Sequence, residues 1–244
     1  MLTANPETDC LPLDTVNTER CPLCGALSDF AGLVLARSHY ACTTCDLRFI
    51  SPRDHLSPDQ EYERYLLHQN SLSDAGYVRF LMGAVKGLAA HLQKGNDVSP
   101  TVLDYGSGPA PVLVQLLKKE GFDAVGYDPF FGDRSEHDAV VTSSWAGQGP
   151  FDAVVSTETV EHFRSPRTEW AQMISLIRPG GFLVVMTSLV LPGINLSSWY
   201  YATDPTHVAF YSAATFRYIV SHWGLTLVES NGRNQVVMQK SLPD

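Results

Sequence analysis

The sequence predicts an α/β fold, a doubly wound sheet that carries an antiparallel edge. Two observations predict this class. From residue 101 onward, short Val-rich apolar runs alternate with segments of helical period, the pattern of parallel strands covered by helices. The last two strand-like runs are instead joined by the short turn "NGRN", so they should form an antiparallel pair at the edge of the sheet.

The expected elements of this domain follow one another in a regular order. The expected strands are residues 101–106, 124–128, 138–143, 151–157, 182–188, 225–230 and 235–240. The expected helices are residues 111–122, 167–177 and 213–224, and "PGG" at 179–181 is expected to form a turn.

The part of the chain before residue 98 has a different character. Ser57-Pro58 is typical of a helix start, and residues 74–92 carry apolar side chains near the helical period. We therefore expect four segments. These are a polar leader (1–17), a cysteine-rich module (18–56), a helical lid or linker segment (57–97) and the α/β domain (98–244).

Composition limits the classes of function. The 244 residues have a formal net charge of −9, so no overall positive field attracts nucleic acid. The acidic, polar start does not resemble a signal peptide. No apolar run reaches the roughly 18 residues of a membrane-spanning helix. We expect a soluble cytoplasmic protein that has no membrane partner and binds small molecules rather than nucleic acid.

Four of the five cysteines are regularly spaced. Cys21, Cys24, Cys42 and Cys45 form the pattern C-x2-C-x17-C-x2-C, with Gly25 placed to relieve the backbone after the first pair. Four thiolates at this spacing predict a closed, tetrahedral, structural zinc site, and the metal would supply folding energy to the module. The alternatives are two redox pairs or unrelated buried thiols. Cys10, in the leader, is expected to be a free thiol.

The charge of this module bears on its partner. Arg20, Arg37, Arg48 and Arg53 are balanced by Glu19, Asp29, Asp46 and Asp54. The module therefore has no basic stripe for a phosphate backbone, which weakens a nucleic-acid interpretation without excluding it.

The glycine loop "VLDYGSGPAP" (102–111) predicts the ligand of the α/β domain. Its pattern does not match a dinucleotide loop, because Pro111 stands where the third glycine belongs, and it contains no Walker-type Lys. Pro109 offers no N–H to a pyrophosphate, whereas Asp104 would suit an ammonium group. Asp128, at the end of the second strand, is placed to accept both hydroxyls of a ribose. A ligand with a ribose, an adenine and an amino-acid tail fits these residues.

Four motifs in order, "VLDYGSGPA", "GYDP", "FDAVVSTETVEHF" and "LIRPGGFLVVMT", resemble the Rossmann-like S-adenosylmethionine-dependent methyltransferases. Ala110 stands where the family usually has a third glycine. The resemblance implies that the methionine end of the cofactor lies at the glycine loop, the ribose at Asp128, and the adenine near "TSSW" (142–145). The cofactor contacts expected from it are Asp104, Gly106, Gly108, Asp128, Pro129, Ser144 and Glu158.

The stretch "ETVEH" has two interpretations. Glu158, Glu161 and His162 resemble the E-x-x-E-H stretch of quinone-biosynthesis O-methyltransferases, where such residues hold a divalent ion. Mg²⁺ or Zn²⁺ could then bind here. Alternatively, the stretch caps and orients the loop after the fourth strand. In both cases Glu161 and His162 would edge the pocket and are candidate catalytic residues.

The aromatic segment "SSWYYATDPTHVAFYS" (197–212) should face the transferred methyl group. His207 within it is a candidate general base, and the alternative is a structural histidine that bonds a loop carbonyl. In relatives, helices like those of residues 57–97 cover the cofactor, so Tyr65 and Asn70 are candidate lid residues, with plain helix packing as the alternative.

Three hypotheses about function follow. The first is a methyltransferase that acts on an O, C or N atom of a small molecule, since some sugar C-methyltransferases also have an amino-terminal zinc module. The second is an RNA methyltransferase, because some ribosomal RNA base methyltransferases begin with a module similar to "RCPLCG". The third is a non-catalytic protein that binds the cofactor or a partner. The sequence leaves the acceptor and the oligomeric state open.

Overall fold

The computed structural model describes residues 18–67, 70–92, 98–131, 141–142 and 149–243, which form two sheets. The larger sheet has the order β11-β12-β9-β8-β5-β6-β7. Its strands are β5 (Thr101–Tyr105), β6 (Asp123–Tyr127), β7 (Val141–Thr142), β8 (Phe151–Thr157), β9 (Ile177–Met186), β11 (Leu225–Ser230) and β12 (Gln235–Lys240). β5 to β9 are parallel, and β12 and β11 add the antiparallel edge. The predicted fold class is confirmed.

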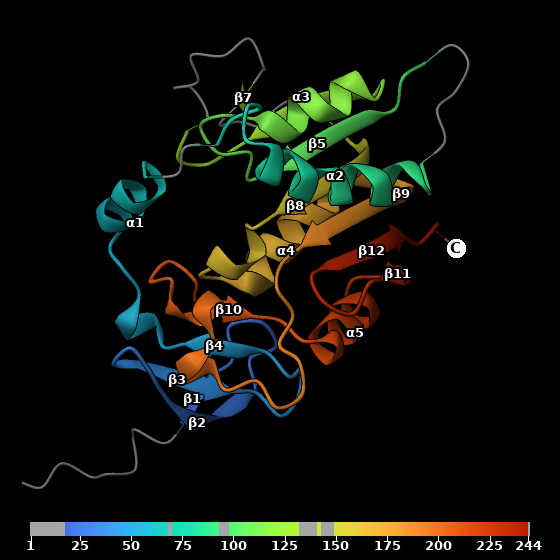
Figure 1. Ribbon diagram of the computed structural model, residues 1–244. Helices are drawn as coiled ribbons and strands as arrows, with labels where there is room; N and C mark the ends of the chain where they lie inside the picture. The colour runs from blue at the N-terminus through green and yellow to red at the C-terminus, as the bar shows by residue number, and fades with distance from the viewer. Residues whose placement is uncertain (1–17, 68–69, 93–97, 132–140, 143–148, 244) are drawn as a thin grey trace, which may run out of the picture.

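Helices cover both faces of this sheet (Figure 1). α2 (Ala75–Ala89) and α3 (Val112–Lys119) pack on one face, and α4 (Pro166–Ser175) and α5 (Ala213–His222) pack on the other. Successive strand residues point to opposite faces, so Val102 joins the core under α2 and α3 whereas Leu103 joins the core under α4 and α5. In the described part of the chain, no helix is long and apolar enough to cross a membrane.

The helix starts follow from the sequence. The Ser57 hydroxyl accepts a hydrogen bond from the Gln60 amide, and the Gln60 side chain accepts one from the Ser57 amide, which is a complete capping box. The helix that starts there is α1 (Pro58–Tyr65). At the start of α2 the Asp74 carboxylate accepts the amides of Gly76 and Tyr77, which is a simple N-cap.

The turn expected at 179–181 is not a turn. These residues lie inside β9 as a bulge, since Phe151 pairs with Ile177 while Ala153 pairs with Phe182. A β-carbon on Gly181 would come within 2.7 Å of the Asp152 carbonyl oxygen, so this close approach of two backbones requires glycine. The two glycines therefore bend a strand instead of ending it.

The second sheet combines four strands of residues 18–50 with one short strand at residues 209–210. Its order is β1-β2-β3-β4-β10, all antiparallel. The strands are β1 (Thr18–Arg20), β2 (Leu27–Val34), β3 (Arg37–Ala41), β4 (Arg48–Ile50) and β10 (Ala209–Phe210). We call residues 18–56 the N-terminal module. Because β10 comes from the segment between β9 and α5, the N-terminal module lies directly against the carboxyl-terminal half of the chain (Figure 1).

Candidate functional site

A cavity of about 540 Å³ opens at the carboxyl ends of β5, β6 and β8. This is the position where ligands bind in doubly wound sheets, next to the point where the strand order reverses. The predicted cofactor residues that the structure brings together in its lining are Asp104, Gly106, Gly108, Asp128, Pro129 and Glu158. Ser144 lies outside the described residues.

Two glycines shape the loop after β5. Gly106 has φ +87°, and a β-carbon there would come within 2.4 Å of the Thr159 side chain. The amides of Gly106 and Ser107 both donate to the Tyr127 carbonyl, at 2.7 and 3.0 Å. Gly108 has φ +67° with open space around it. Gly106 is thus required by both backbone conformation and space, and Gly108 by conformation alone.

Asp104 is a buried carboxyl group at the end of β5. Its residue is 2% exposed, and its Oδ1 atom has no hydrogen-bond partner among the described residues. Burial, and then the nearby charge of Asp128, raise the pKa of this carboxyl to about 8. A buried polar atom without a hydrogen-bond partner lowers the stability of the folded state, so such atoms are often found where a ligand binds. Asp104 is therefore suited to a positively charged ligand group.

Asp128 holds two loops together. One carboxylate oxygen accepts the Gly108 amide at 3.0 Å, and the other accepts the amides of Phe130 and Phe131 at 2.8 and 3.1 Å. Burial raises the pKa of Asp128, and the three amide hydrogen bonds lower it in part. Each oxygen keeps acceptor capacity for a ligand hydroxyl.

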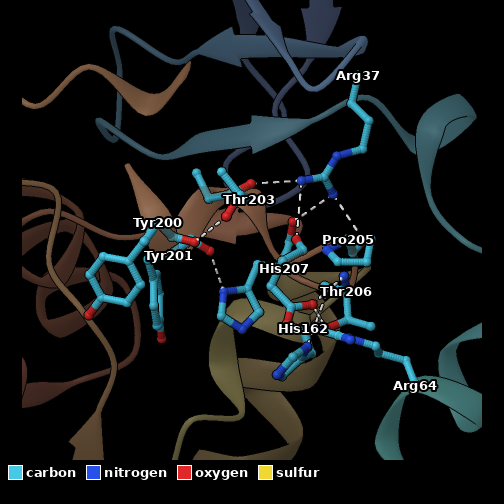
Figure 2. Close-up of polar contacts among 11 residues, drawn as sticks. Arg37, Arg64, His162, Tyr200, Tyr201, Thr203, Pro205, Thr206 and His207 are labelled. Atoms are coloured by element: carbon cyan, nitrogen blue, oxygen red, sulfur yellow. Dashed lines mark hydrogen bonds and ion pairs between the residues drawn. The ribbon is translucent and has the colours of Figure 1, made fainter. Parts of the chain in front are cut away.

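His207 lies on the cavity wall that comes from the segment between β9 and α5. It is 9% exposed, and its Nδ1 atom lies 2.7 Å from the Tyr201 carbonyl oxygen (Figure 2). A carbonyl oxygen can only accept, so Nδ1 carries the hydrogen and Nε2 carries the lone pair. The predicted candidate base thus has the tautomer that allows Nε2 to accept a proton, and it also makes the loop-carbonyl bond of the alternative interpretation.

His162 lies beside His207 in a matching arrangement. Its Nδ1 atom is 3.1 Å from the Thr206 carbonyl oxygen, and the two imidazole rings are 4.7 Å apart between centroids. His162 belongs to a short 3-10 helix, η4 (Val160–His162), that follows β8. Nδ1 of His162 therefore also carries its hydrogen, which leaves Nε2 with the lone pair.

Glu161 completes this cluster. The residue is fully buried, and its Oε1 atom accepts the Tyr201 hydroxyl at 2.5 Å. Oε2 has no partner in the described part of the chain. Burial raises the pKa of Glu161, while the hydrogen bond from the Tyr201 hydroxyl opposes that shift. Glu161 is thus a second buried carboxyl group with an unused oxygen.

The metal ligands suggested by "ETVEH" are rearranged in the structure. Ligand atoms of Glu161, His162 and His207 all lie within 4.8 Å of one another, a group that could hold a cation. Glu158 is not in this group of described residues, although it lines the cavity. Its backbone is left-handed, with φ +49°, and burial and then the charge of Glu161 raise its pKa to about 9. Such strain at a non-glycine residue is typical of functional sites.

The four predicted zinc ligands form one cluster in the N-terminal module. Sγ of Cys21 is 3.5 Å from Sγ of Cys45, and Sγ of Cys24 is 3.4 Å from Sγ of Cys42. All four sulfur atoms lie within 4.8 Å of one another. These separations exceed a disulfide bond and approach the roughly 3.8 Å edge of a tetrahedron with Zn–S bonds of about 2.3 Å. The chemistry and the geometry both fit a structural zinc ion.

The turns that present these cysteines are equivalent. The amides of Gly25 and Asp46 donate to the carbonyls of Cys21 and Cys42, each at 2.9 Å. Gly25 has φ +81°, as expected, and Asp46 adopts φ +59° in the second turn. Asp tolerates this conformation better than most residues. Cys10 lies outside the described residues.

Sequence reasoning missed several side chains of the cavity. In the sequence Tyr201 is one of several aromatic residues, yet its hydroxyl donates to Glu161 and its ring lies beside that of His207, with centroids 4.3 Å apart. Tyr65, a candidate lid residue, donates to Glu61 at 2.6 Å and packs edge-on against His162. No local pattern in the sequence signals these contacts. Tyr201 and Tyr65 meet Glu161 and His162 only through the fold, and the bond from Tyr65 to Glu61 is one of many side-chain pairs that a helix permits.

The cavity lining is rich in carboxyl groups. Its described residues include six carboxyl groups and no Lys or Arg. Two of these groups are paired with arginines behind the lining, Glu61 with Arg164 at 2.6 Å and Asp204 with Arg64 at 3.1 Å. The lining therefore offers little attraction to an anionic group.

Comparisons with known proteins agree with this geometry. A family model described as "Methyltransferase domain" matches residues 76–230, and no curated protein matches the chain. The 1,6-didemethyltoxoflavin-N1-methyltransferase of Burkholderia thailandensis, solved with its substrate and S-adenosylhomocysteine, superposes with a TM-score of 0.51 at 16% identity and covers 88% of this chain and 99% of its own. A chain from the complex between the Haloferax volcanii Trm112 methyltransferase activator and a candidate methyltransferase superposes with a TM-score of 0.55 at 14% identity. The match covers 77% of this chain and 99% of that chain. At these identities the likeness is one of fold.

The match to the family model spans more than half of the chain. It includes the glycine loop, Asp104, Asp128 and all the parallel strands of the larger sheet. The chain therefore belongs to the methyltransferase domain family. It is an S-adenosylmethionine-dependent methyltransferase with a Rossmann-like fold.

Proposed function

We propose that this methyltransferase acts on a small-molecule acceptor and that His207 is its general base. The observation that supports the proposal most strongly is the position of His207 on the cavity that also contains Asp104 and Asp128. In this proposal the cofactor's ammonium group binds Asp104 and its ribose binds Asp128. Ser144 stays a predicted adenine contact.

The reaction needs little covalent help from the chain. The sulfonium of the cofactor supplies a methyl group that is already activated. The cavity holds the acceptor in line with that methyl and excludes water, which supplies most of the rate effect. As the new bond forms, Nε2 of His207 takes the proton of an acceptor hydroxyl or amine, and Nδ1 stays bonded to the Tyr201 carbonyl. The methyl group would move from the sulfonium to the acceptor atom, so that S-adenosylhomocysteine would be the second product.

Two features disfavour the RNA alternative. The described cavity lining has no Lys or Arg, and the charges of the N-terminal module cancel. Nucleic-acid affinity depends mainly on neutralising phosphates. The closed set of four thiols is proposed to hold a structural zinc ion that stabilises the N-terminal module.

A second proposal for the same wall is a divalent cation. The unpartnered Oε2 of Glu161 and the closeness of ligand atoms of His162 and His207 favour it, since ligating histidines usually donate one N–H to a carbonyl. Mg²⁺ or Zn²⁺ held there would polarise the acceptor. The His207 base and the cation are alternatives that chelation separates, because only the cation is removed by a chelator.

Transfer of a labelled methyl group tests the proposed function. The protein is incubated with methyl-labelled cofactor and either a small-metabolite extract or total RNA. We expect label in the small-metabolite fraction and none above background in RNA. Label in RNA alone would support the alternative, and no transfer to either fraction, despite cofactor binding, would indicate a non-catalytic protein.

Removal of the Asp128 carboxylate should weaken cofactor binding. Asp128→Ala loses charged hydrogen bonds to the ribose worth about 1.5–3 kcal/mol, so affinity for S-adenosylhomocysteine should fall roughly ten- to a hundredfold. Calorimetry measures this loss. Asp128→Asn is the matched control for size and should bind more tightly than Asp128→Ala. An unchanged affinity in both variants would rule out the ribose contact.

Cofactor binding should depend on pH through Asp104. In the protein without ligand, the Asp104 carboxyl group has a pKa of about 8 and is protonated at pH 6. The ammonium group of a bound cofactor would stabilise the carboxylate and lower that pKa. Binding therefore releases a proton, and affinity for S-adenosylhomocysteine should rise from pH 6 toward pH 8 by up to about tenfold per unit. Calorimetry in buffers of different ionisation enthalpy counts that proton. Asp104→Asn should show weaker binding without proton release, and equal proton release in this variant would contradict the assignment.

A further inference from the structure

The residue after His207 links the N-terminal module to the catalytic wall. The Val208 carbonyl accepts the Ile50 amide of the N-terminal module at 2.9 Å, and the Val208 amide donates to the Glu161 carbonyl at 2.9 Å. The next two residues form β10, paired with Phe49 and Arg48 of β4. The backbone on the carboxyl side of His207 is therefore part of the N-terminal sheet.

One side chain of the N-terminal module holds the backbone on the other side of His207. The Arg37 guanidinium donates four hydrogen bonds to carbonyl oxygens of a single segment, which we call the histidine loop (residues 200–207) (Figure 2). The acceptors are the carbonyls of Ala202 at 2.8 Å, Asp204 at 3.1 Å, Pro205 at 2.9 Å and His207 at 3.2 Å. The planar, rigid fork of Arg can satisfy four acceptors at once, which the single ammonium of Lys cannot.

The turn that presents Arg37 is strained. β2 and β3 are joined by Leu35 and Ala36, both with positive φ, at 49° and 66°. Asn-Gly or Asp-Gly would be the favoured pair in such a two-residue hairpin. Strained backbone persists only where surrounding contacts over-determine it, and the four hydrogen bonds of Arg37 are such contacts.

The histidine loop presents the reactive side chains. The Tyr201 carbonyl sets the tautomer of His207, and the Tyr201 hydroxyl binds Glu161. From α1, Arg64 pairs with the Asp204 carboxylate at 3.1 Å, so the loop is also held from the lid side (Figure 2). A shift of this loop would turn the His207 ring away from its carbonyl partner and from the cavity.

We propose that Arg37 is a positioning residue, through which the cysteine-rich module fixes the ring orientation and tautomer of His207. The proposal rests on the proposed role of His207 as base. In this proposal the N-terminal module holds in place the wall of the acceptor site that carries His207.

The tautomer of His207 provides a direct test that needs no acceptor. Long-range ¹H–¹⁵N spectra of imidazole-labelled protein resolve the two ring nitrogens of each of the eight histidines, and the His207→Gln variant assigns the signal. Wild-type His207 should show a fixed Nδ1–H tautomer. In Arg37→Gln the two ¹⁵N shifts should move toward their average, while zinc content and affinity for S-adenosylhomocysteine stay at wild-type values.

Two further variants make the test specific. Arg53→Gln, in the same module, removes an arginine that pairs with Glu19 at the surface, and it should leave the His207 signals unchanged. Arg37→Lys, used also if Arg37→Gln does not fold, should show the same loss of a fixed tautomer. With any acceptor found by methyl transfer, kcat of the folded Arg37 variants should fall on the order of 10² with little change in KM for the cofactor.

The outcomes that overturn the proposal are distinct from failure of the proposed function. A fixed Nδ1–H tautomer in both Arg37 variants would overturn it even if methyl transfer to a small molecule is confirmed. Loss of the tautomer only together with loss of cofactor binding would also overturn it, because Arg37 would then support the fold in general. A protein without transferase activity could still show the predicted change of tautomer.

Discussion

His207→Ala should lower the rate of methyl transfer by about 10²–10⁴ for a hydroxyl or amine acceptor, because loss of a positioned base has that effect. Affinity for S-adenosylhomocysteine should stay near wild type, since Asp104 and Asp128 are untouched. Steady-state kinetics and calorimetry on the same preparation measure both quantities.

The matched control is His222→Ala, at the end of α5 and away from the described cavity lining, which should keep wild-type kinetics. Chelation separates the two proposals for this wall. If Glu161, His162 and His207 hold a cation, a chelator should stop the reaction, and added Mg²⁺ or Zn²⁺ should restore it. Full activity of His207→Ala, together with no effect of a chelator, would contradict both the His207 base and the bound cation. Alignment of the acceptor with the methyl group would then account for the rate by itself.

Cys24→Ser should release zinc and unfold the N-terminal module. A structural zinc ion contributes about 10–16 kcal/mol in zinc-finger peptides, and removing one of four thiolate ligands forfeits much of that. The loss should extend beyond the module, because its core is continuous with that of α4 and α5. Tyr40 and Phe49 share one buried cluster with Trp170 and Phe216. Metal analysis and circular dichroism measure the two effects.

Cys10→Ser is the control for removal of a thiol, since Cys10 lies in the leader outside the four-cysteine pattern. It should keep one zinc per chain. A pure wild-type protein without zinc, or a module that stays folded after chelation, would show that the four thiols have another role. Between the two pairs, a hydrogen bond from Cys45 lowers the pKa of the Cys21 thiol to about 5, while the same bond raises the pKa of Cys45. Cys21 can therefore ionise readily, whereas a bound cation would stabilise the thiolates of Cys24 and Cys45, whose pKa values are raised.

The parts of this protein that could be predicted from sequence are those encoded by local patterns. Alternating Val-rich runs and helical periods predicted the sheet, and the C-x2-C pairs predicted the thiol cluster. Asp104 and Asp128 could be placed because carboxyl ends of parallel strands always meet at one edge of the sheet. Each of these inferences needs only neighbouring residues and a general rule of folding.

The remaining features depend on contacts between distant segments. β10 has two residues and no periodicity, so its pairing with β4 has no signal in the sequence. In the sequence Arg37 is one of four arginines whose charges are balanced by four carboxylates. Its proposed role depends on hydrogen bonds to four carbonyls about 170 residues away. The bulge at Gly180 and Gly181 resembles a turn in sequence, because glycine relieves close backbone approach in both cases.

A crystal structure with S-adenosylhomocysteine bound tests the central claim most directly, since it shows which residues surround the cofactor's sulfur. The account predicts the amino group at Asp104, the ribose at Asp128 and the sulfur facing His207 and His162 of the cavity lining, with room for a small acceptor between them. A sulfur atom that faces away from His207, or a ligand bound outside this cavity, would contradict the account.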